Sequence, residues 1–252
     1  MDLIAYYRRQ YSWRHWRFIY DQLPPVHDRI LLDLGCGIGD QSADLAAYGA
    51  RVIGIDGNAD VISAATARAL PGCQFFQSNL RALPSTLPKV DGLWSSFVAA
   101  YFPAFVPVLR GWLRHLRPGG WVAFTEIDDL FAHAPLDAST RRYLSGYCAE
   151  AFSAGRYHFH MGRDLVDHMR SAGLRVLSTF DVPDDEFSRS GPVTADVADA
   201  WMQRLDGMTL LRDYCGSAFP RVRGDFMTCI TSTEHQSASR VRCVVAEWLG
   251  AD

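Results

Sequence analysis

The sequence predicts an α/β domain built on a doubly wound, mostly parallel β-sheet. Short apolar segments of strand length alternate with segments of helical periodicity along most of the chain. Hydrophobic residues make up 48% of the 252 residues, which is enough for a large core. A glycine-rich turn, Gly35 to Gly39, also follows the first apolar segment and precedes a helical one, as in β-α-β units that bind nucleotides.

The first β-α-β unit spans residues 30–58. An apolar strand at 30–34 runs into the glycine turn, where a ligand can approach the backbone closely because glycine has no Cβ. A helix at 40–48 and a strand at 51–55 follow, and the second strand ends at Asp56. An acid about 20 positions past the glycines accepts hydrogen bonds from ribose hydroxyls. The unit is therefore expected to bind an adenosine-containing ligand.

The other elements follow from periodicity and from turn residues. The sequence predicts further helices at 2–22, 61–70, 104–116, 138–154, 163–172 and 194–212. It predicts further strands at 74–77, 90–95, 121–126, 174–182 and 241–248, which makes seven strands in all. The last strand is expected to be antiparallel to its neighbours.

The spacing of the glycines indicates which adenosine ligand fits. A dinucleotide fingerprint needs glycine or alanine where Asp40 stands, and this carboxylate would lie beside a pyrophosphate. Asp33 places a second acid just before the turn. S-adenosylmethionine has no phosphate and carries an ammonium and a sulfonium, so acids suit it better.

The run Asp33-Leu-Gly-Cys-Gly-Ile-Gly39 resembles the first motif of the class I SAM-dependent methyltransferases, and Asp56 resembles their ribose-binding acid. The Leu-Arg-Pro-Gly-Gly120 turn before an apolar strand is also similar to this family, so the resemblance covers residues 30–128 in order. It implies a Rossmann-like sheet with S-adenosyl-L-methionine as the cofactor. The implied cofactor-binding residues are Asp33, Gly35, Cys36, Gly37, Gly39, Asp56, Gly57, Asn58, Asn79, Leu80, Ser96 and Phe97. Asn79 stands where the family usually has an acid, although its carbonyl can still accept a hydrogen bond.

The resemblance also implies a single domain arranged around the cofactor. Residues 1–28 are expected to form a helical lid, 29–130 the cofactor-binding core, and 131–170 and 183–225 insertions on the substrate side. Residues 171–182 and 226–252 would close the sheet. The N-terminal helix is rich in aromatic and basic residues, so it could instead simply pack on the domain with solvated arginines, or lie on a membrane.

Methyl transfer is an in-line displacement that needs a base only if the acceptor arrives protonated. Glu126, with Asp128 two residues on, follows the fifth strand, and His158 and His160 lie in an aromatic loop. These three, Glu126, His158 and His160, are the candidate catalytic residues, although ordinary structural hydrogen bonds could equally explain each. Tyr101 and His133 are weaker candidates. No metal is expected, and residues 184–186 are interpreted as a solvated acidic loop.

Composition narrows the remaining choices. The net charge of −3 gives no general attraction to nucleic acid or to anionic membranes. The six cysteines form no C-x-x-C pair, and no signal-peptide or membrane-spanning segment is recognised, so a cytoplasmic protein is expected. The sequence leaves the oligomeric state open.

The sequence therefore predicts a methyltransferase acting on a small-molecule acceptor in secondary metabolism, with possible assistance by a histidine or glutamate base. Two other classes stay open. One is an NAD(P)-dependent oxidoreductase, and the other is a scaffold that binds the cofactor without turnover. The segment 94–97 also lacks the Asn/Asp-Pro-Pro-Tyr pattern of adenine methyltransferases acting on nucleic acid.

Overall fold

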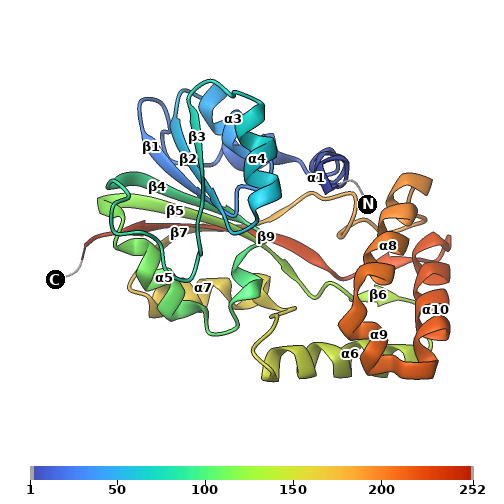
Figure 1. Cartoon of the computed structure of the whole chain (residues 1–252). Coiled ribbons are helices and arrows are strands. Elements are labelled where there is room, and N and C mark those ends of the chain that lie inside the picture. Colours follow the sequence, from blue (N-terminus) through green and yellow to red (C-terminus); the bar gives the residue numbers. More distant parts are fainter. Residues whose placement is uncertain (1–2, 251–252) are drawn as a thin grey trace.

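A computed structural model describes residues 3–250 and confirms the α/β class. Seven strands form one sheet in the order β3-β2-β1-β4-β5-β9-β7 (Figure 1). Strand β9 is antiparallel to both of its neighbours, and the remaining pairs are parallel, as the sequence predicts. The strands are β1 (Ile30–Leu34), β2 (Arg51–Asp56), β3 (Cys73–Gln77), β4 (Val90–Ser96), β5 (Leu116–Asp128), β7 (Arg175–Val182) and β9 (Arg240–Trp248).

Helices cover both faces of this sheet and extend beyond one edge. The helices are α1 (Leu3–Tyr11), α2 (Trp16–Tyr20), α3 (Asp40–Ala47), α4 (Ala59–Ala67), α5 (Phe105–Leu113), α6 (Ala138–Ser153), α7 (Met161–Ser171), α8 (Ala195–Gly207), α9 (Thr209–Cys215) and α10 (Phe219–Thr231). Two 3₁₀ turns, η1 (Ala99–Tyr101) and η2 (Gly216–Ala218), complete the set. None of the helices between residues 3 and 250 is long and apolar enough to cross a lipid bilayer.

Successive side chains of the central strands pack in two different hydrophobic cores, because neighbouring residues of a strand point to opposite faces of the sheet. Leu31 of β1 and Trp94 of β4 pack in the core that includes residues of α2 and α3. Leu32 of β1 and Phe124 of β5 pack in the other, with residues of α5 and α7. All four side chains are fully buried. This double burial explains why these strands read as continuous apolar runs.

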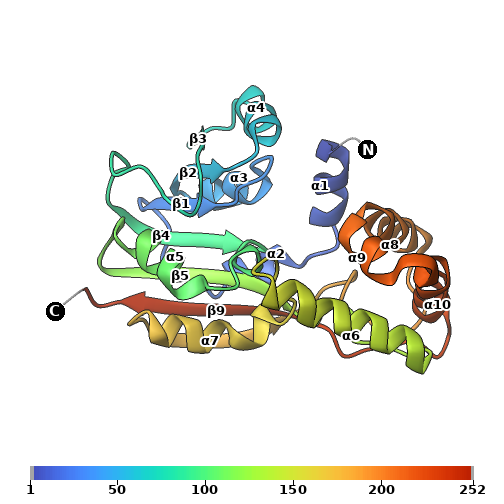
Figure 2. The same cartoon turned by 60° about the horizontal axis from the view of Figure 1, so that its bottom comes forward.

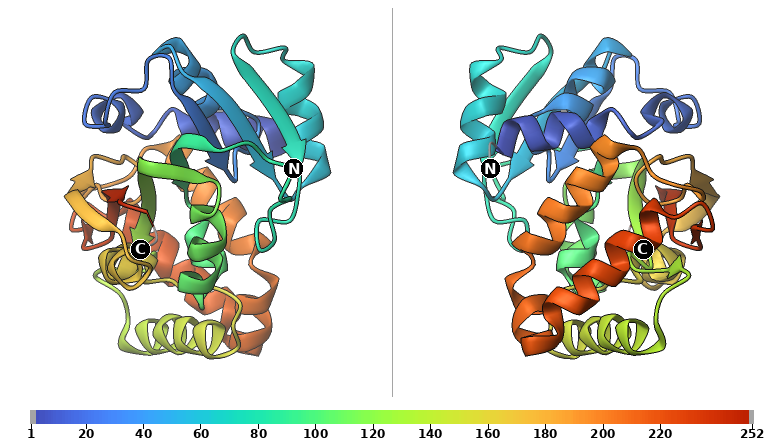
Figure 3. Two further views of the ribbon diagram at one scale, coloured as in Figure 1. Left: turned by 90° about the vertical axis from the view of Figure 1, so that its left-hand side faces the viewer. Right: turned by 90° about the vertical axis from the view of Figure 1, so that its right-hand side faces the viewer.

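A second group of helices stands beyond the carboxyl ends of the parallel strands. It comprises α6, α8, α9 and α10, together with a small sheet of β6 (His133–Ala134) and β8 (Gln236–Ser237) (Figures 1 and 3). Helix α1 lies between this group and the α3–α4 side of the sheet (Figure 2). An ion pair joins Arg9 of α1 to Asp196 of α8 at 2.7 Å. The two groups and α1 therefore enclose the edge of the sheet where ligands of this fold bind.

Several elements differ from the sequence prediction. The helix predicted at 2–22 is interrupted between α1 and α2, where Arg14 turns inward to pair with Asp184, and its predicted start at Asp2 lies outside the described residues. The helix predicted at 194–212 is divided between α8 and α9. Helix α10 was not predicted and continues past residue 225, so the helical group extends to Thr231.

Candidate functional site

A cleft of about 590 Å³ lies at the carboxyl ends of β1, β2 and β4. Its walls come from the glycine turn after β1, the end of β2, the segment after β4, and α1. Its size is in the range of small-molecule and cofactor sites. Open α/β sheets bind their ligands at this edge, so the cleft is the candidate functional site.

The glycine turn has the backbone that its sequence predicts. Gly35, Gly37 and Gly39 have φ angles of +79°, +52° and +83°, a region that residues with side chains rarely adopt. A Cβ on Gly35 would lie 2.1 Å from a methyl carbon of Val98, and one on Gly39 would lie 2.7 Å from the ring of Phe75. Packing therefore excludes side chains at two of the glycines, and the turn can present its backbone to a ligand.

Asp56 joins the end of β2 to this turn. One carboxylate oxygen accepts the backbone N–H of Gly37 at 3.1 Å, and the other accepts that of Asn58 at 2.9 Å. The carboxylate also lines the cleft. Each oxygen has a second lone pair, so the group can still accept hydrogen bonds from two ribose hydroxyls.

The structure brings most of the predicted cofactor residues together. The residues of that set that line the cleft are Gly35, Cys36, Gly37, Asp56, Asn58, Leu80, Ser96 and Phe97. Gly57 and Asn79 line an adjoining hollow that shares Leu80 and Phe102 with the cleft. An adenine held next to a ribose on Asp56 would lie on this side.

Two residues of the predicted set, Asp33 and Gly39, line neither the cleft nor the adjoining hollow. Asp33 is 2% exposed and accepts the hydroxyl of Ser42 at 2.5 Å, so it fastens β1 to α3 behind the turn. Burial raises the pKa of Asp33 to about 7, partly offset by the Ser42 hydrogen bond. Its role in this structure is to hold the turn from behind.

The N-terminal helices are anchored to α3 by tyrosines. The hydroxyls of Tyr11 and Tyr20 both donate to the Asp44 carboxylate of α3, the second at 2.9 Å. The Tyr11 ring stacks on Trp16 with 6.0 Å between centroids. Tyr6, Tyr7 and Tyr11 of α1 line the cleft. These contacts hold α1 over the glycine turn.

The acidic segment 184–186 is not the solvated loop that the sequence predicts. Asp184 and Glu186 are 5% and 1% exposed, because two arginines from other parts of the chain cover them. Arg14 places its guanidinium 2.7 Å from Glu186 and 3.4 Å from Asp184, and Arg204 of α8 pairs with the other oxygen of Glu186. Burial raises the pKa of Asp184, although Arg14 opposes the shift. Both arginines line the cleft.

Glu126 lies at the carboxyl end of β5 but not in the wall of the cleft. It is 2% exposed and accepts the backbone N–H of Ala99 at 2.5 Å. Burial raises its pKa to about 8, although the backbone N–H groups around it oppose the shift. In this position Glu126 holds η1, which carries Tyr101 into the cleft.

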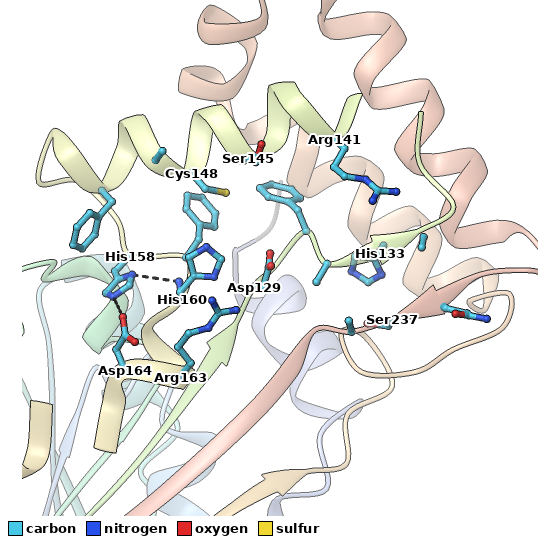
Figure 4. Close-up of a pocket in the computed structure, with 18 residues that line it drawn as sticks. Asp129, His133, Arg141, Ser145, Cys148, His158, His160, Arg163, Asp164 and Ser237 are labelled. Carbon is cyan, nitrogen blue, oxygen red and sulfur yellow. Dashed lines mark hydrogen bonds and ion pairs between the residues drawn. The ribbon is translucent and has the colours of Figure 1, made fainter. Parts of the chain in front are cut away.

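His158 and His160 line a different cavity, of about 780 Å³ (Figure 4). This cavity lies between α6, the start of α7 and the segment after β5. Both nitrogens of the His158 ring are engaged: Nε2 lies 2.8 Å from an Asp164 oxygen, and Nδ1 accepts the backbone N–H of His160 at 3.3 Å. Burial lowers the pKa of His158, although Asp164 opposes the shift. The neighbouring Tyr157, in contrast, faces the cofactor cleft.

His160 is the more accessible of the two histidines, and its Nδ1 lies 3.6 Å from an oxygen of Asp128. Arg163 reaches the same oxygen at 2.9 Å. Burial alone would raise the pKa of the Asp128 carboxyl. The contacts with His160 and Arg163 outweigh burial, so this pKa is below its usual range. Asp128 and His160 therefore form part of an ion-pair cluster outside the cofactor cleft.

Sequence reasoning assigned no site role to several residues that line the cleft, among them Arg204, Tyr157 and Phe187. They come from segments far apart in the chain, and no local motif marks any of them. Arg14 was noticed only as one of several basic residues in an aromatic helix. Its place between Trp13 and Trp16 was the available signal of burial.

Comparisons with known proteins agree with this geometry. Residues 31–120 match the sequence profile of a methyltransferase domain family. A trans-aconitate 2-methyltransferase from Azoarcus sp. is 39% identical over 95 residues, which are 37% of this chain and 37% of that relative. The first relative matched is thus covered over little more than a third of its own length. A trans-aconitate 2-methyltransferase from Afipia carboxidovorans is 28% identical over 240 residues, covering 81% of this chain and 90% of the relative.

Solved structures share the fold over a longer stretch. A putative methyltransferase from Bacillus halodurans superposes with a TM-score of 0.63 and 15% sequence identity, covering 94% of this chain and 99% of that one. Identity this low shows the fold alone. The chain therefore has the fold of this solved structure, and residues 31–120, which include the glycine turn and Asp56, resemble a methyltransferase domain.

Proposed function

We propose that this protein transfers the methyl group of S-adenosylmethionine to a small-molecule acceptor held in the cleft below α1. The observation that carries the proposal is the Asp56 carboxylate, which bridges the glycine turn and the end of β2 at the wall of the cleft. A small acceptor is supported by the lid-like position of α1, which leaves limited room beside the cofactor. The aromatic lining favours a flat or amphiphilic acceptor, of the kind found in secondary metabolism.

The chemistry that this site supports is displacement at an already activated methyl group. The cleft supplies proximity, orientation and exclusion of water. Glu126, His158 and His160 do not line it, which disfavours direct proton removal by any of them. We therefore propose an acceptor whose nucleophilic atom is unprotonated when it binds, or which loses its proton to solvent before the methyl transfer.

The cofactor half of the proposal can be tested by calorimetric titration with S-adenosylhomocysteine. We expect micromolar binding of this ligand and none of NADH. Asp56→Ala should weaken binding by roughly 1–3 kcal/mol, the cost of removing a charged hydrogen-bond acceptor. Asp60→Asn is the matched control, because Asp60 is an exposed acid four residues further on that does not line the cleft.

Each outcome has a separate meaning. Binding of NADH in place of S-adenosylhomocysteine would favour an oxidoreductase. Equal affinity of the Asp56→Ala variant would remove Asp56 as the ribose acid. Tight S-adenosylhomocysteine binding with no methylated product from any acceptor would favour a scaffold without turnover.

A further inference from the structure

Two guanidinium groups face the cleft, and they differ in how many of their donors are used. Arg14 donates from Nη1 to the carbonyl of Gln10, contacts Glu186 through Nη2, and has Nε 3.4 Å from Asp184. All three of its nitrogens therefore lie near an acceptor, although Nε makes an ion-pair contact and no hydrogen bond within residues 3–250. Arg14 also lies over the ring of Phe97, 4.8 Å from its centroid, next to the end of β4.

Arg204 has only part of its donor set engaged. Its Nη2 pairs with Glu186, but its Nε is buried and has no hydrogen-bond partner in the part of the chain that the structure describes. A guanidinium carries five N–H donors in a fixed plane, and leaving buried donors unpaired is costly. The side chain is 19% exposed and lines the cleft. Nε itself is covered, so an incoming acceptor group would meet the guanidinium at its exposed part, which has no ion-pair partner other than Glu186 among the described residues.

The surroundings of Arg204 favour a planar anion. Its guanidinium lies 5.1 Å from the ring centroid of Phe187 and 5.3 Å from that of Trp201, so aromatic rings hold its plane. Tyr6, Tyr101 and Tyr157 line the same cleft. Burial alone would lower the pKa of Arg204, but the adjacent Glu186 outweighs it, and the side chain stays charged.

We propose that the methyl acceptor carries a carboxylate group and that Arg204 binds this carboxylate, a specificity role that rests on the methyltransferase function proposed above. A carboxylate presents two coplanar oxygens that match the guanidinium fork. The alternative partner within the cleft is the carboxylate of the cofactor's own methionine. Arg14, which lies over Phe97, is the other arginine of the cleft, and the S-adenosylhomocysteine affinity of the Arg204 variants distinguishes the two assignments.

The test is calorimetric titration of the protein saturated with S-adenosylhomocysteine. The probes are trans-aconitate, benzoate and octanoate, each paired with its methyl ester. We expect at least one carboxylate to bind the unmodified protein at least roughly tenfold more tightly than its ester. Arg204→Gln should weaken the binding of that carboxylate roughly 10- to 100-fold, which is the usual cost of a lost charged hydrogen bond. The carboxylate affinity of Arg204→Lys should lie between that of the unmodified protein and that of Arg204→Gln.

S-adenosylhomocysteine affinity is measured in each variant, both as a check on folding and to separate the two proposals. It should change less than about twofold in Arg204→Gln and Arg204→Lys. Arg212→Gln, an exposed arginine of α9 outside the cleft, is the matched control and should bind both ligands as before. No preference for acids over esters, or full carboxylate affinity in both Arg204 variants, would overturn the inference. A tenfold loss of affinity for S-adenosylhomocysteine alone would also overturn it, because that result would assign Arg204 to the cofactor. Failure of the unmodified protein to bind S-adenosylhomocysteine would instead refute the proposed function.

Discussion

Replacing Glu126 by glutamine should change how the stability of this protein depends on pH. Burial raises the pKa of Glu126 from its ordinary 4.5 to about 8, so the folded protein holds a proton there that the unfolded chain releases. Stability contributed by this group is therefore lost as pH rises from about 4.5 to about 8. Each pH unit within that range costs about 1.4 kcal/mol. The loss should be about 2–3 kcal/mol between pH values of about 5.5 and about 7.5.

Glutamine keeps the carbonyl oxygen that accepts the Ala99 N–H but cannot ionise. The assay is urea unfolding followed by circular dichroism at several pH values, with the difference between variant and unmodified protein plotted against pH. Glu126→Gln should gain about 2–3 kcal/mol relative to the unmodified protein across this interval. The exposed Glu234 provides the control, since Glu234→Gln should give a flat difference. A difference for Glu126→Gln that is also flat, within about 0.5 kcal/mol, would refute the assignment of Glu126 as a buried, protonated support for η1.

Three further predictions concern the turn, the lid and the second cavity. Gly35→Ala should destabilise the fold by about 2–3 kcal/mol in thermal unfolding, since its Cβ would lie 2.1 Å from a methyl carbon at φ +79°; unchanged stability would show that the turn can rearrange. Asp44→Asn should weaken the anchoring of α1 by about 1 kcal/mol, because two tyrosine hydroxyls lose a charged acceptor. Faster proteolysis within α1 would report this, and equal protection would argue against it. His160→Gln should retain methyl transfer once an acceptor is known, since His160 lines the other cavity, and a tenfold loss of turnover would return it to the reaction.

The cofactor half of the site could be predicted because its determinants are local in sequence. Positive φ angles at Gly35 and Gly37, and an acid at the end of the next strand, are properties of one β-α-β unit. Neighbouring parallel strands then bring these groups to the same edge without help from other segments. The sheet class could also be predicted from local sequence, because strands that are buried on both faces consist of continuous apolar runs.

The acceptor half could not be predicted, because its groups meet only through long-range packing. Residues 184–186 form a polar run that ordinarily indicates a solvated loop. Their burial depends on Arg14, which precedes this segment in the sequence, and on Arg204, which follows it. The aromatic loop before α7 was predicted to lie on the substrate side, but its side chains divide between two cavities. Tyr157 consequently faces the cleft, while His158 faces the other cavity.

The central position of Glu186 has a consequence for how the cleft is held together. It is the shared anion of two arginines, one before α2 and one on α8, so it connects the N-terminal segment to the helical group through a single buried carboxylate. Removing this shared partner leaves Arg204 without an acid and Arg14 with Asp184 alone, and an uncompensated buried charge is costly. One carboxylate also cannot satisfy both guanidinium groups. The buried Nε atoms of both arginines make no hydrogen bond within residues 3–250, and the acceptor carboxylate proposed above would add a second anion at the exposed part of Arg204.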